Sequence, residues 1–223
     1  LIAITVKMVE EAIEADIIGP YVDRWAPDVN TNEITMKWIQ DHYAYEMRKQ
    51  KRPQPAAAVT GKPVQFGGMP GRKEATGLGL HYALQVFRRE GAAELSDEPT
   101  AVIQGFGSVG SHFAKFAKEF GIKIVAVMDQ YGGFYHPDFS LDELLAYVAR
   151  NPKKRVAGFQ EVCKGDLLST PEELFSVKAD IAVPAALEEA ITPKFAKLLR
   201  ANVLLVGANG PTLPEAEPIL DEK

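Results

Sequence analysis

Three glycines stand at a spacing that suits phosphate binding. The stretch GFGSVG places them at positions 105, 107 and 110, after the apolar run TAVIQ and before residues with helical periodicity. Between a strand and a helix, such glycines allow a tight turn, a close approach of backbone to a pyrophosphate, and contact between helix and strand. The phosphates would face free N–H groups at the positive end of the helix dipole. The pattern taken alone also fits a purely structural turn.

An acidic residue follows at a matching distance. Asp129 ends the next apolar run, KIVAVMD, nineteen residues beyond Gly110. This is close to the offset of about 20 residues at which a carboxylate reaches the adenosine ribose hydroxyls. A carboxylate there would repel a 2′-phosphate, so the sequence favours NAD over NADP, although Asp129 also fits a polar turn residue ahead of QYGG. The motif residues expected at the cofactor are Gly105, Phe106, Gly107, Ser108, Val109 and Gly110.

The elements that must position these residues alternate along the chain from residue 100 onward. Apolar, β-branched runs occur as TAVIQ, KIVAVMD, ADIAVPAA and NVLLVGAN, with helices expected at 109–120, 141–150 and 192–200. Strands that are apolar on both faces and separated by helices predict a parallel sheet covered on both sides. We therefore expect a doubly wound, mostly parallel, Rossmann-like α/β domain.

The first 70 residues have a different pattern. Helical periodicity opens the chain and returns at 33–49, where Ile34, Trp38, His42 (or Ile39) and Tyr45 are predicted to face a core. A stretch rich in proline and glycine, 51–71, then predicts a domain boundary, so the expected domains are 1–70 and 71–223. Gly77 and Gly79, inside the next helical segment, indicate a close approach to its backbone.

Composition excludes several classes of protein. The 223 residues include 25 basic and 30 acidic side chains, mixed along the chain without a long basic run, so nucleic acid is not an expected partner. No apolar stretch approaches the roughly 20 residues of a membrane span and no signal peptide opens the chain, so a cytoplasmic location is expected. One cysteine and four separated histidines predict no metal site. The chain starts without Met, in helical register, and ends abruptly, so both ends look like cuts through a longer protein.

Three further motifs are more specific than the glycine turn. They are APDVNTNE at 26–33, TGKPVQFGGMPGRKEATGLGL at 60–80 and VGANGPTLPEA at 206–216, supported by ADIAVPAALEEAIT at 179–192. In this order, on both sides of GFGSVG, they resemble glutamate dehydrogenases of the amino acid dehydrogenase superfamily. The resemblance implies that 1–70 is the C-terminal part of a substrate and oligomerisation domain, and that 71–223 is a dinucleotide-binding domain truncated at its C-terminal end.

The resemblance also implies roles for single residues. Asp28 matches the family's catalytic aspartate, which relays protons between the substrate nitrogen and a water as an iminium forms and is hydrolysed; an Asp here would also suit a helix cap. Arg72 and Thr76 match positions at the nicotinamide end, where Thr76 would bind the carboxamide. The other matches are Ser108 at the pyrophosphate or ribose, Ala185 and Ala186 beside the adenosine ribose, and Asn209 at the nicotinamide ribose.

Some positions depart from the family pattern. Leu78 stands where the family commonly has Arg, Val206 where it has an acidic residue, and Glu189 where it has Asn. The family's substrate lysines lie in GGxKGG-like stretches upstream of APDVNT, and no such stretch occurs in these residues.

The activity implied by the resemblance is reversible, NAD-dependent oxidative deamination of L-glutamate to 2-oxoglutarate and ammonium, carried out by a homohexamer. Two other readings stay open at this point. The protein would be a nucleotide-binding regulatory paralogue if it cannot turn over without the substrate lysines, or a dehydrogenase of another amino acid if its side-chain pocket differs.

Overall fold

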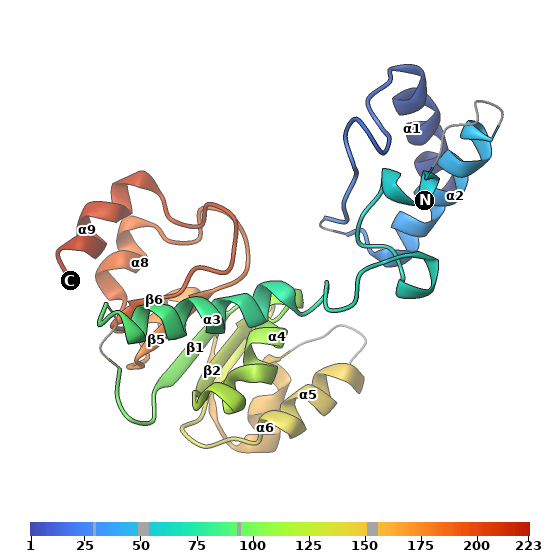
Figure 1. Cartoon of the computed structure of the whole chain (residues 1–223). Coiled ribbons are helices and arrows are strands. Elements are labelled where there is room, and N and C mark those ends of the chain that lie inside the picture. The colour runs from blue at the N-terminus through green and yellow to red at the C-terminus, as the bar shows by residue number, and fades with distance from the viewer. Residues whose placement is uncertain (29, 49–53, 93–94, 151–155) are drawn as a thin grey trace. The chain divides into compact units, whose positions relative to one another are not determined.

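The computed structural model describes residues 1–28, 30–48, 54–92, 95–150 and 156–223 (Figure 1). Residues 51–53 of the predicted boundary stretch therefore lie outside the described part. The chain divides into two compact units, Leu1–Arg72 and Lys73–Lys223. Within the described ranges, no helix is long and apolar enough to cross a membrane.

The first unit is helical. Its elements are α1 (Ile2–Glu14), α2 (Glu33–Met47) and the short 3-10 helices Pro55–Ala58 and Val64–Phe66. Helix α2 starts at Asn32, whose side-chain oxygen accepts hydrogen bonds from the N–H groups of Ile34 (2.9 Å) and Thr35 (3.2 Å). These bonds satisfy two of the donors that a helix N-terminus leaves unpaired, which explains why the helix begins there.

The face of α2 that packs agrees with the predicted one at Ile39 but differs from it at two other positions. Ile34 and Tyr45 are 49% and 53% exposed, so their predicted core role was wrong. The buried side chains of this helix are Thr35, Met36, Ile39, Tyr43 and Met47. Apolar side chains surround much of this helix, so spacings of three and four residues fit more than one stripe, and packing against α1 selects the one that is buried.

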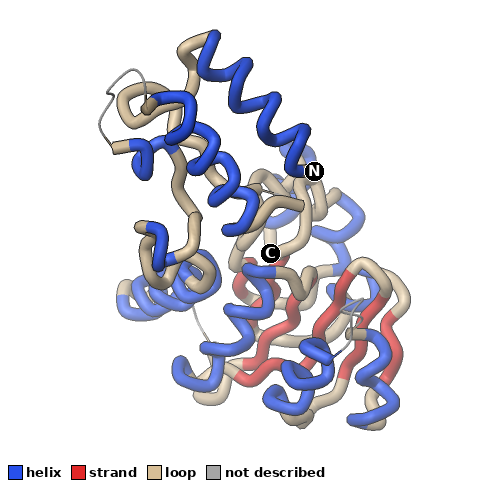
Figure 2. The backbone as a smooth tube through the Cα atoms, turned by 90° about the vertical axis from the view of Figure 1, so that its right-hand side faces the viewer, coloured by secondary structure: helices blue, strands red, loops and turns tan. Residues whose placement is uncertain are grey.

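The second unit is built on a six-stranded sheet (Figure 2). Its order is β4-β3-β2-β1-β5-β6. The strands are β1 (Thr100–Gln104), β2 (Lys123–Asp129), β3 (Gly132–Tyr135), β4 (Asp166–Leu168), β5 (Ile181–Pro184) and β6 (Val203–Leu204). Strands β2, β1, β5 and β6 pair in parallel, and β3 and β4 join as antiparallel neighbours. The mostly parallel sheet and the α/β class are confirmed, whereas β3 and β4 were not predicted.

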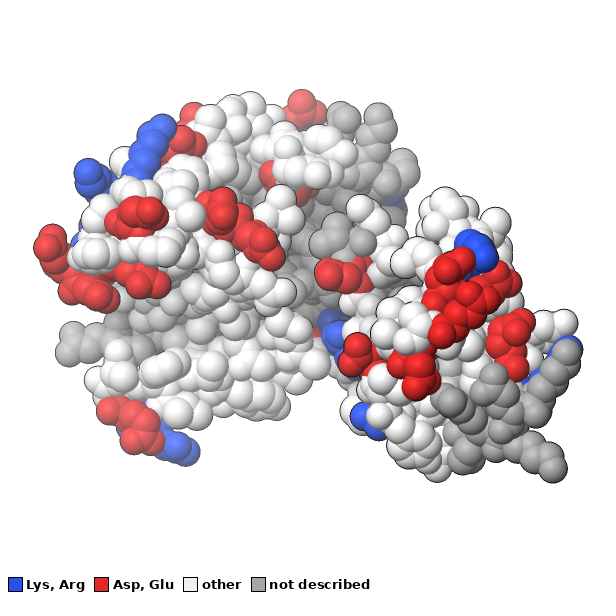
Figure 3. All heavy atoms as spheres, turned by 90° about the horizontal axis from the view of Figure 1, so that it is seen from above, with Lys and Arg blue, Asp and Glu red and all other residues white. Residues whose placement is uncertain are grey.

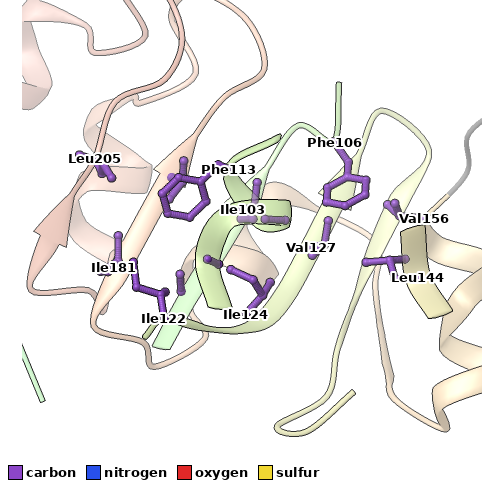
Figure 4. Packing of buried hydrophobic residues seen from close by; sticks show 14 of the residues in the cluster. Ile103, Phe106, Phe113, Ile122, Ile124, Val127, Leu144, Val156, Ile181 and Leu205 are labelled. Atoms are coloured by element: carbon purple, nitrogen blue, oxygen red, sulfur yellow. The ribbon is translucent and has the colours of Figure 1, made fainter. Parts of the chain in front are cut away.

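Helices cover both faces of this sheet. They are α3 (Ala75–Arg89), α4 (Ser108–Ala117), α5 (Leu141–Arg150), α6 (Gln160–Cys163), α7 (Pro171–Phe175), α8 (Pro193–Leu198) and α9 (Glu217–Asp221). On one face, Ile103 of β1 belongs to the same buried cluster as Phe113 of α4 and Leu144 of α5 (Figure 4). On the other face, Val102 lies in a cluster with Leu174 of α7. Burial on both faces explains why the central strands are continuously apolar.

Helices α3 and α4 pack at very close range. A Cβ added to Gly77 would lie 2.6 Å from the nitrogen of Phe113 and 2.8 Å from the carbonyl oxygen of Val109. The predicted close approach is therefore present at Gly77. At Gly79 an added Cβ would meet no described atom within 4 Å.

A buried histidine fills the same helix interface. The ring of His81 stacks on Phe113 and Phe120, with centroids 4.1 and 4.5 Å away. Its Nε2 donates to the carbonyl oxygen of Phe113 at 2.8 Å. Burial lowers the pKa of His81 below its ordinary value, while the bond to this carbonyl acts in the opposite sense. Both its stacking and its lowered pKa fit a neutral ring packed in the core.

The two glycines of α3 give a matched test of this packing. Gly77→Ala should destabilise the unit by about 1–3 kcal/mol, because the new methyl group meets fixed backbone atoms. Gly79→Ala should stabilise it by about 0.5–1 kcal/mol, because Ala is the better helix former and the site is open. Urea unfolding followed by circular dichroism measures both values, and equal effects of the two substitutions would contradict the packing argument.

Candidate functional site

The turn between β1 and α4 depends on two glycines. Gly105 has a φ of +91°, in the left-handed region. A Cβ added to it would lie 2.7 Å from the carbonyl oxygen of Ala185 and 2.8 Å from the Cα of Ala186. A Cβ on Gly110 would overlap the carbonyl oxygen of Gly105. Packing therefore requires both glycines, which hold helix α4 directly against the end of β1.

The third glycine of the motif lies in open space. Gly107 is the N-cap of α4 with an extended backbone, and an added Cβ would meet no described atom within 4 Å. The helical bond nearest this end joins the N–H of Ser111 to the carbonyl oxygen of Gly107 at 3.1 Å. The N–H groups of residues 108–110 precede that bond, as at any helix N-terminus. The fold does not need a glycine at position 107, but a ligand that approaches these N–H groups would.

A cavity of about 760 Å³ lies at the carboxyl ends of β1, β2 and β5. It is lined by residues 104–107, 128–132, 185–188 and 190, together with Ser169 and Pro171. Ligand pockets in proteins commonly have volumes of about 300–1,000 Å³. In open α/β sheets, ligands bind beyond the carboxyl ends of the strands, where the strand order reverses. Here β1 pairs with β2 on one side and with β5 on the other, so the cavity lies at that reversal.

The side chain of Phe106 is buried although this residue lines the cavity. Figure 4 shows its ring beside Val127, within the core cluster. Phe106 therefore anchors the glycine turn to the core, and any ligand contact from this residue would come from its backbone.

Asp129 lines the cavity and also organises the turn after β2. One carboxylate oxygen accepts the N–H of Tyr131 and the other accepts the N–H of Val156, both at 2.8 Å. A carboxylate has about four lone-pair positions, so two bonds leave room for further donors. The turn role and a ligand role are thus compatible in one side chain.

The remaining residues of the second unit lie on neighbouring loops. The N–H of Ala185 donates to the carbonyl oxygen of Gln104 at 2.7 Å, which fixes the start of the loop after β5. A Cβ added to Gly207, after β6, would lie 3.0 Å from a methyl group of Val109. Asn209, two residues further on, is exposed and does not belong to the cavity lining. The structure therefore brings together the glycine turn, Asp129 and residues 185–186, with Asn209 on an adjacent loop.

The helix starts of the second unit carry two further predicted residues. Ser108, in the first turn of α4, donates from its hydroxyl to the carbonyl oxygen of Lys73 at 3.4 Å. Thr76 is exposed in the first turn of α3. Arg72 is exposed at the end of the first unit.

Asp28 lies in a turn of the first unit and is exposed. The N–H of Thr31 donates to the carbonyl oxygen of Asp28 at 2.9 Å, and the N–H of Asp28 donates to the hydroxyl of Thr31 at 2.7 Å. The cap of α2 is Asn32 rather than Asp28. The carboxylate of Asp28 is therefore not needed to start that helix.

Among the cavity residues that sequence reasoning missed are Tyr131, Ser169 and Leu187. Ser169 follows β4, a strand that was not predicted. Leu187 and Tyr131 are 68% and 49% exposed. Their large apolar or aromatic side chains close behind predicted strands were the available signal, because such side chains line most ligand pockets. Among the described residues, no group of three or more His, Cys, Asp or Glu side chains could hold a metal ion.

Basic and acidic side chains both occur on one face of the protein. On the face drawn in Figure 3, the described Lys and Arg side chains stand apart among acidic ones, in keeping with the net charge of −5.

The sheet order, the glycine turn and the helices on both faces define a doubly wound, Rossmann-like α/β protein. Residues 67–223 match the family model described as Glutamate/Leucine/Phenylalanine/Valine dehydrogenase. The chain belongs to this family, which confirms the resemblance found in its motifs.

Curated relatives cover nearly the whole chain. It is 42% identical over 212 residues to the glutamate dehydrogenase of Thermotoga maritima, covering 93% of this chain and 48% of that protein. It is 38% identical to an NADP-specific glutamate dehydrogenase of Synechocystis, covering 96% and 49%. It is 36% identical to a cryptic catabolic NAD-specific glutamate dehydrogenase of Bacillus subtilis, covering 94% and 46%. The chain thus spans about half the length of these relatives.

Solved structures agree on the fold. The hetero-hexameric glutamate dehydrogenase of Thermus thermophilus, in a Leu-bound form, superposes with a TM-score of 0.81 at 30% identity. The match covers 98% of this chain and 49% of that one.

Two glycines of the motif should respond differently to a methyl group. Gly110→Ala should cost about 1–3 kcal/mol, because the methyl group meets the carbonyl of Gly105 inside the strand–helix contact. Gly107→Ala should cost no more than about 1 kcal/mol, the usual loss when an N-cap becomes Ala. Urea unfolding without cofactor measures both, and a loss at position 107 as large as that at 110 would show that the space beside Gly107 is filled.

Proposed function

We propose that this chain supplies the coenzyme-binding unit and an adjoining part of the substrate unit of an NAD-dependent glutamate dehydrogenase. The whole enzyme would interconvert L-glutamate with 2-oxoglutarate and ammonium. The open space at Gly107, beside a cavity at the strand ends, carries the proposal, because it is room that a bound pyrophosphate would use and the fold itself does not. Names of relatives with 36–42% identity support the reaction.

The residues around the cavity fit a dinucleotide. The N–H groups of residues 108–110 would donate to the pyrophosphate, Asp129 would accept from the adenosine ribose, and residues 185–186 would form the wall beside that ribose. Arg72, Thr76 and Asn209 would bind the nicotinamide end. NAD, when bound, supplies the group that accepts a hydride from the substrate, and the protein supplies alignment.

The choice of NAD over NADP rests on Asp129. Asp129 lines the cavity, and its carboxylate would repel a 2′-phosphate there. Family membership alone leaves the choice open, since the Synechocystis relative is named NADP-specific and the Bacillus relative NAD-specific. The local carboxylate therefore carries this part of the proposal.

Asp28 would relay protons between the substrate nitrogen and water. An exposed carboxylate can exchange protons with both, and the hydrogen bonds between the backbone of Asp28 and Thr31 hold the turn that carries it. The whole protein would also assemble as a hexamer through its substrate domain; the solved relative from Thermus thermophilus is described as hetero-hexameric.

Calorimetric titration of the chain with NAD and with NADP tests cofactor binding, and a glutamate-dependent NADH assay on the full-length protein tests turnover. Tight NAD binding together with turnover supports the proposal. NAD binding by a full-length protein without turnover would favour a regulatory role. Turnover with leucine, phenylalanine or valine in preference to glutamate would assign another substrate.

Asp129→Asn should weaken NAD binding about tenfold and lower the ratio of NAD to NADP affinity, because the negative charge that excludes a 2′-phosphate is lost. Asn keeps the size of the side chain and one acceptor for the turn. The matched control is Asp138→Asn, which removes a carboxylate paired with Lys123 at 2.9 Å, outside the cavity lining. Calorimetry gives both affinities, and an unchanged ratio would mean that the ribose is recognised elsewhere.

Asp28→Asn should lower the turnover of the full-length enzyme by about 100- to 10,000-fold, the usual contribution of an acid–base group. Affinity for NAD should stay within about twofold, because Asp28 is assigned to proton transfer. The control is Asp23→Asn, another exposed aspartate of the same loop. Steady-state kinetics with glutamate decides, and full activity of Asp28→Asn would remove this residue from the mechanism.

A further inference from the structure

Two loops at the carboxyl edge of the sheet are joined through their backbones. We define the β5 loop as residues 185–191 and the β6 loop as residues 205–213. The β5 loop contributes residues 185–188 and 190 to the cavity wall. The β6 loop carries Asn209, the residue proposed for the nicotinamide ribose.

The connection consists of hydrogen bonds between main-chain groups. The N–H of Glu189 donates to the carbonyl oxygen of Gly210 at 3.1 Å, and the N–H of Ile191 donates to that of Pro211 at 2.6 Å. In addition, the N–H of Leu213 donates to the carbonyl oxygen of Ile191 at 3.0 Å. The β6 loop therefore cannot move away from the β5 loop without breaking all of these bonds.

Glu189 makes this connection in an unfavourable conformation. Its φ of +55° lies in the left-handed region, which glycine and asparagine adopt readily and other residues rarely do. Gly210, its partner across the two loops, is also left-handed, with a φ of +48°. A glutamate at this position indicates that the surrounding contacts enforce the turn.

The turn lies between two cavity residues, just before the chain enters the core. Glu188 and Ala190 line the cavity, whereas Glu189 between them is exposed and does not line it. Directly after the turn, Ile191 is 1% exposed and belongs to the core cluster beneath α7 and α8. The backbone of Glu189, rather than its carboxylate, therefore directs the chain from the cavity wall into the core.

We propose that Glu189 is a positioning residue that locks the cavity wall formed by the β5 loop to the loop that carries Asn209. Its left-handed backbone sets the place of residues 185–188 relative to Asn209, and so fixes the spacing between the adenosine and nicotinamide ends of a bound dinucleotide. Pre-organisation of this kind strengthens binding without a direct contact. The identity of the ligand rests on the proposed function, but the coupling of the loops does not.

The first test measures the coupling without cofactor. Glu189→Val disfavours the left-handed conformation because Val is β-branched. Exchange of the amide hydrogen of Ile191 should become at least about tenfold faster, while that of Ala185, bonded to Gln104, stays unchanged. Glu189→Asn should exchange like the natural chain, because Asn tolerates this conformation. Unaltered exchange at Ile191 in Glu189→Val would overturn the proposal.

The second test measures its consequence. Glu189→Val should weaken NAD binding at least about tenfold, and Glu189→Asn should bind within about twofold of the natural chain. The control is Lys164→Val, since Lys164 has a similar φ of +56° at the end of α6, outside the cavity lining. The Lys164→Val variant should have a lower melting temperature than the natural chain and an unchanged affinity for NAD. Equal loss of NAD affinity in Lys164→Val and Glu189→Val would overturn the proposal by showing a general stability effect.

The design separates two kinds of failure. If the natural chain binds neither NAD nor NADP, the proposed function fails, and amide exchange still decides whether Glu189 couples the loops. If Glu189→Val does not fold, Glu189→Ala replaces it, because Ala lacks the β-branch and the same comparisons apply at smaller amplitude.

Discussion

The absence of side chains at Gly105 and Gly110 is the constraint on which the second unit depends. The carbonyl oxygen of Gly105 occupies the place that a Cβ at position 110 would take. Helix α4 can therefore lie against the end of β1 only because residue 110 is glycine. The β5 loop packs on the other side of the same turn, where residues 185–186 fill the place of a Cβ on Gly105. Helix α3 then reaches α4 through Gly77. The glycines of this turn, together with Gly77 of α3, thus set the positions of two helices and one loop.

The same turn explains why there is room for a ligand. Strand β1, which leads into this turn, pairs with β2 on one side and β5 on the other. The loops after β2 and β5 diverge here, because the strand order reverses at β1. Protein atoms occupy the space beside Gly105 and Gly110 where a Cβ would lie, whereas the corresponding space beside Gly107 is open. Gly105 and Gly110 are therefore required by packing, whereas Gly107 keeps the adjacent space open. The sequence pattern alone does not distinguish these two roles.

The parts of the fold that could be predicted are those whose residue pattern is compatible with only one secondary structure and one buried face. Strands β1 and β2 are apolar without interruption because both faces are buried, and their bounds were predicted as observed. Strand β3 was missed because Gly132 and Gly133 read as a turn. A Cβ on Gly133 would lie 2.8 Å from the Cα of Met128, so glycine is required for pairing with β2 and not for a turn. The buried face of α2 was predicted only in part, since apolar residues on several faces leave the choice to its partner helix.

The same distinction applies to the candidate site. Asp129 was predicted from its position at the end of a strand, because successive parallel strands end at the same edge of a sheet, whereas Ala185 and Ala186 were predicted from the family resemblance. Ser169 and the turn at Glu189 could not be found that way, since one follows an unpredicted strand and the other acts through its backbone conformation rather than its side-chain type.

Asp129 shows that part of the cavity wall is pre-organised without a ligand. Each of its carboxylate oxygens is held by a backbone N–H group, so the side chain does not have to be ordered on binding. The loop after β5 is held in the same way, by the bond from Ala185 to Gln104 at its start and by the bonds to the β6 loop at its end. A rigid wall loses little conformational entropy when it binds, and it discriminates by charge and shape because it cannot adapt to a wrong ligand. Under the proposed function, selectivity in this cavity would therefore depend as much on main-chain bonds as on the carboxylate they orient.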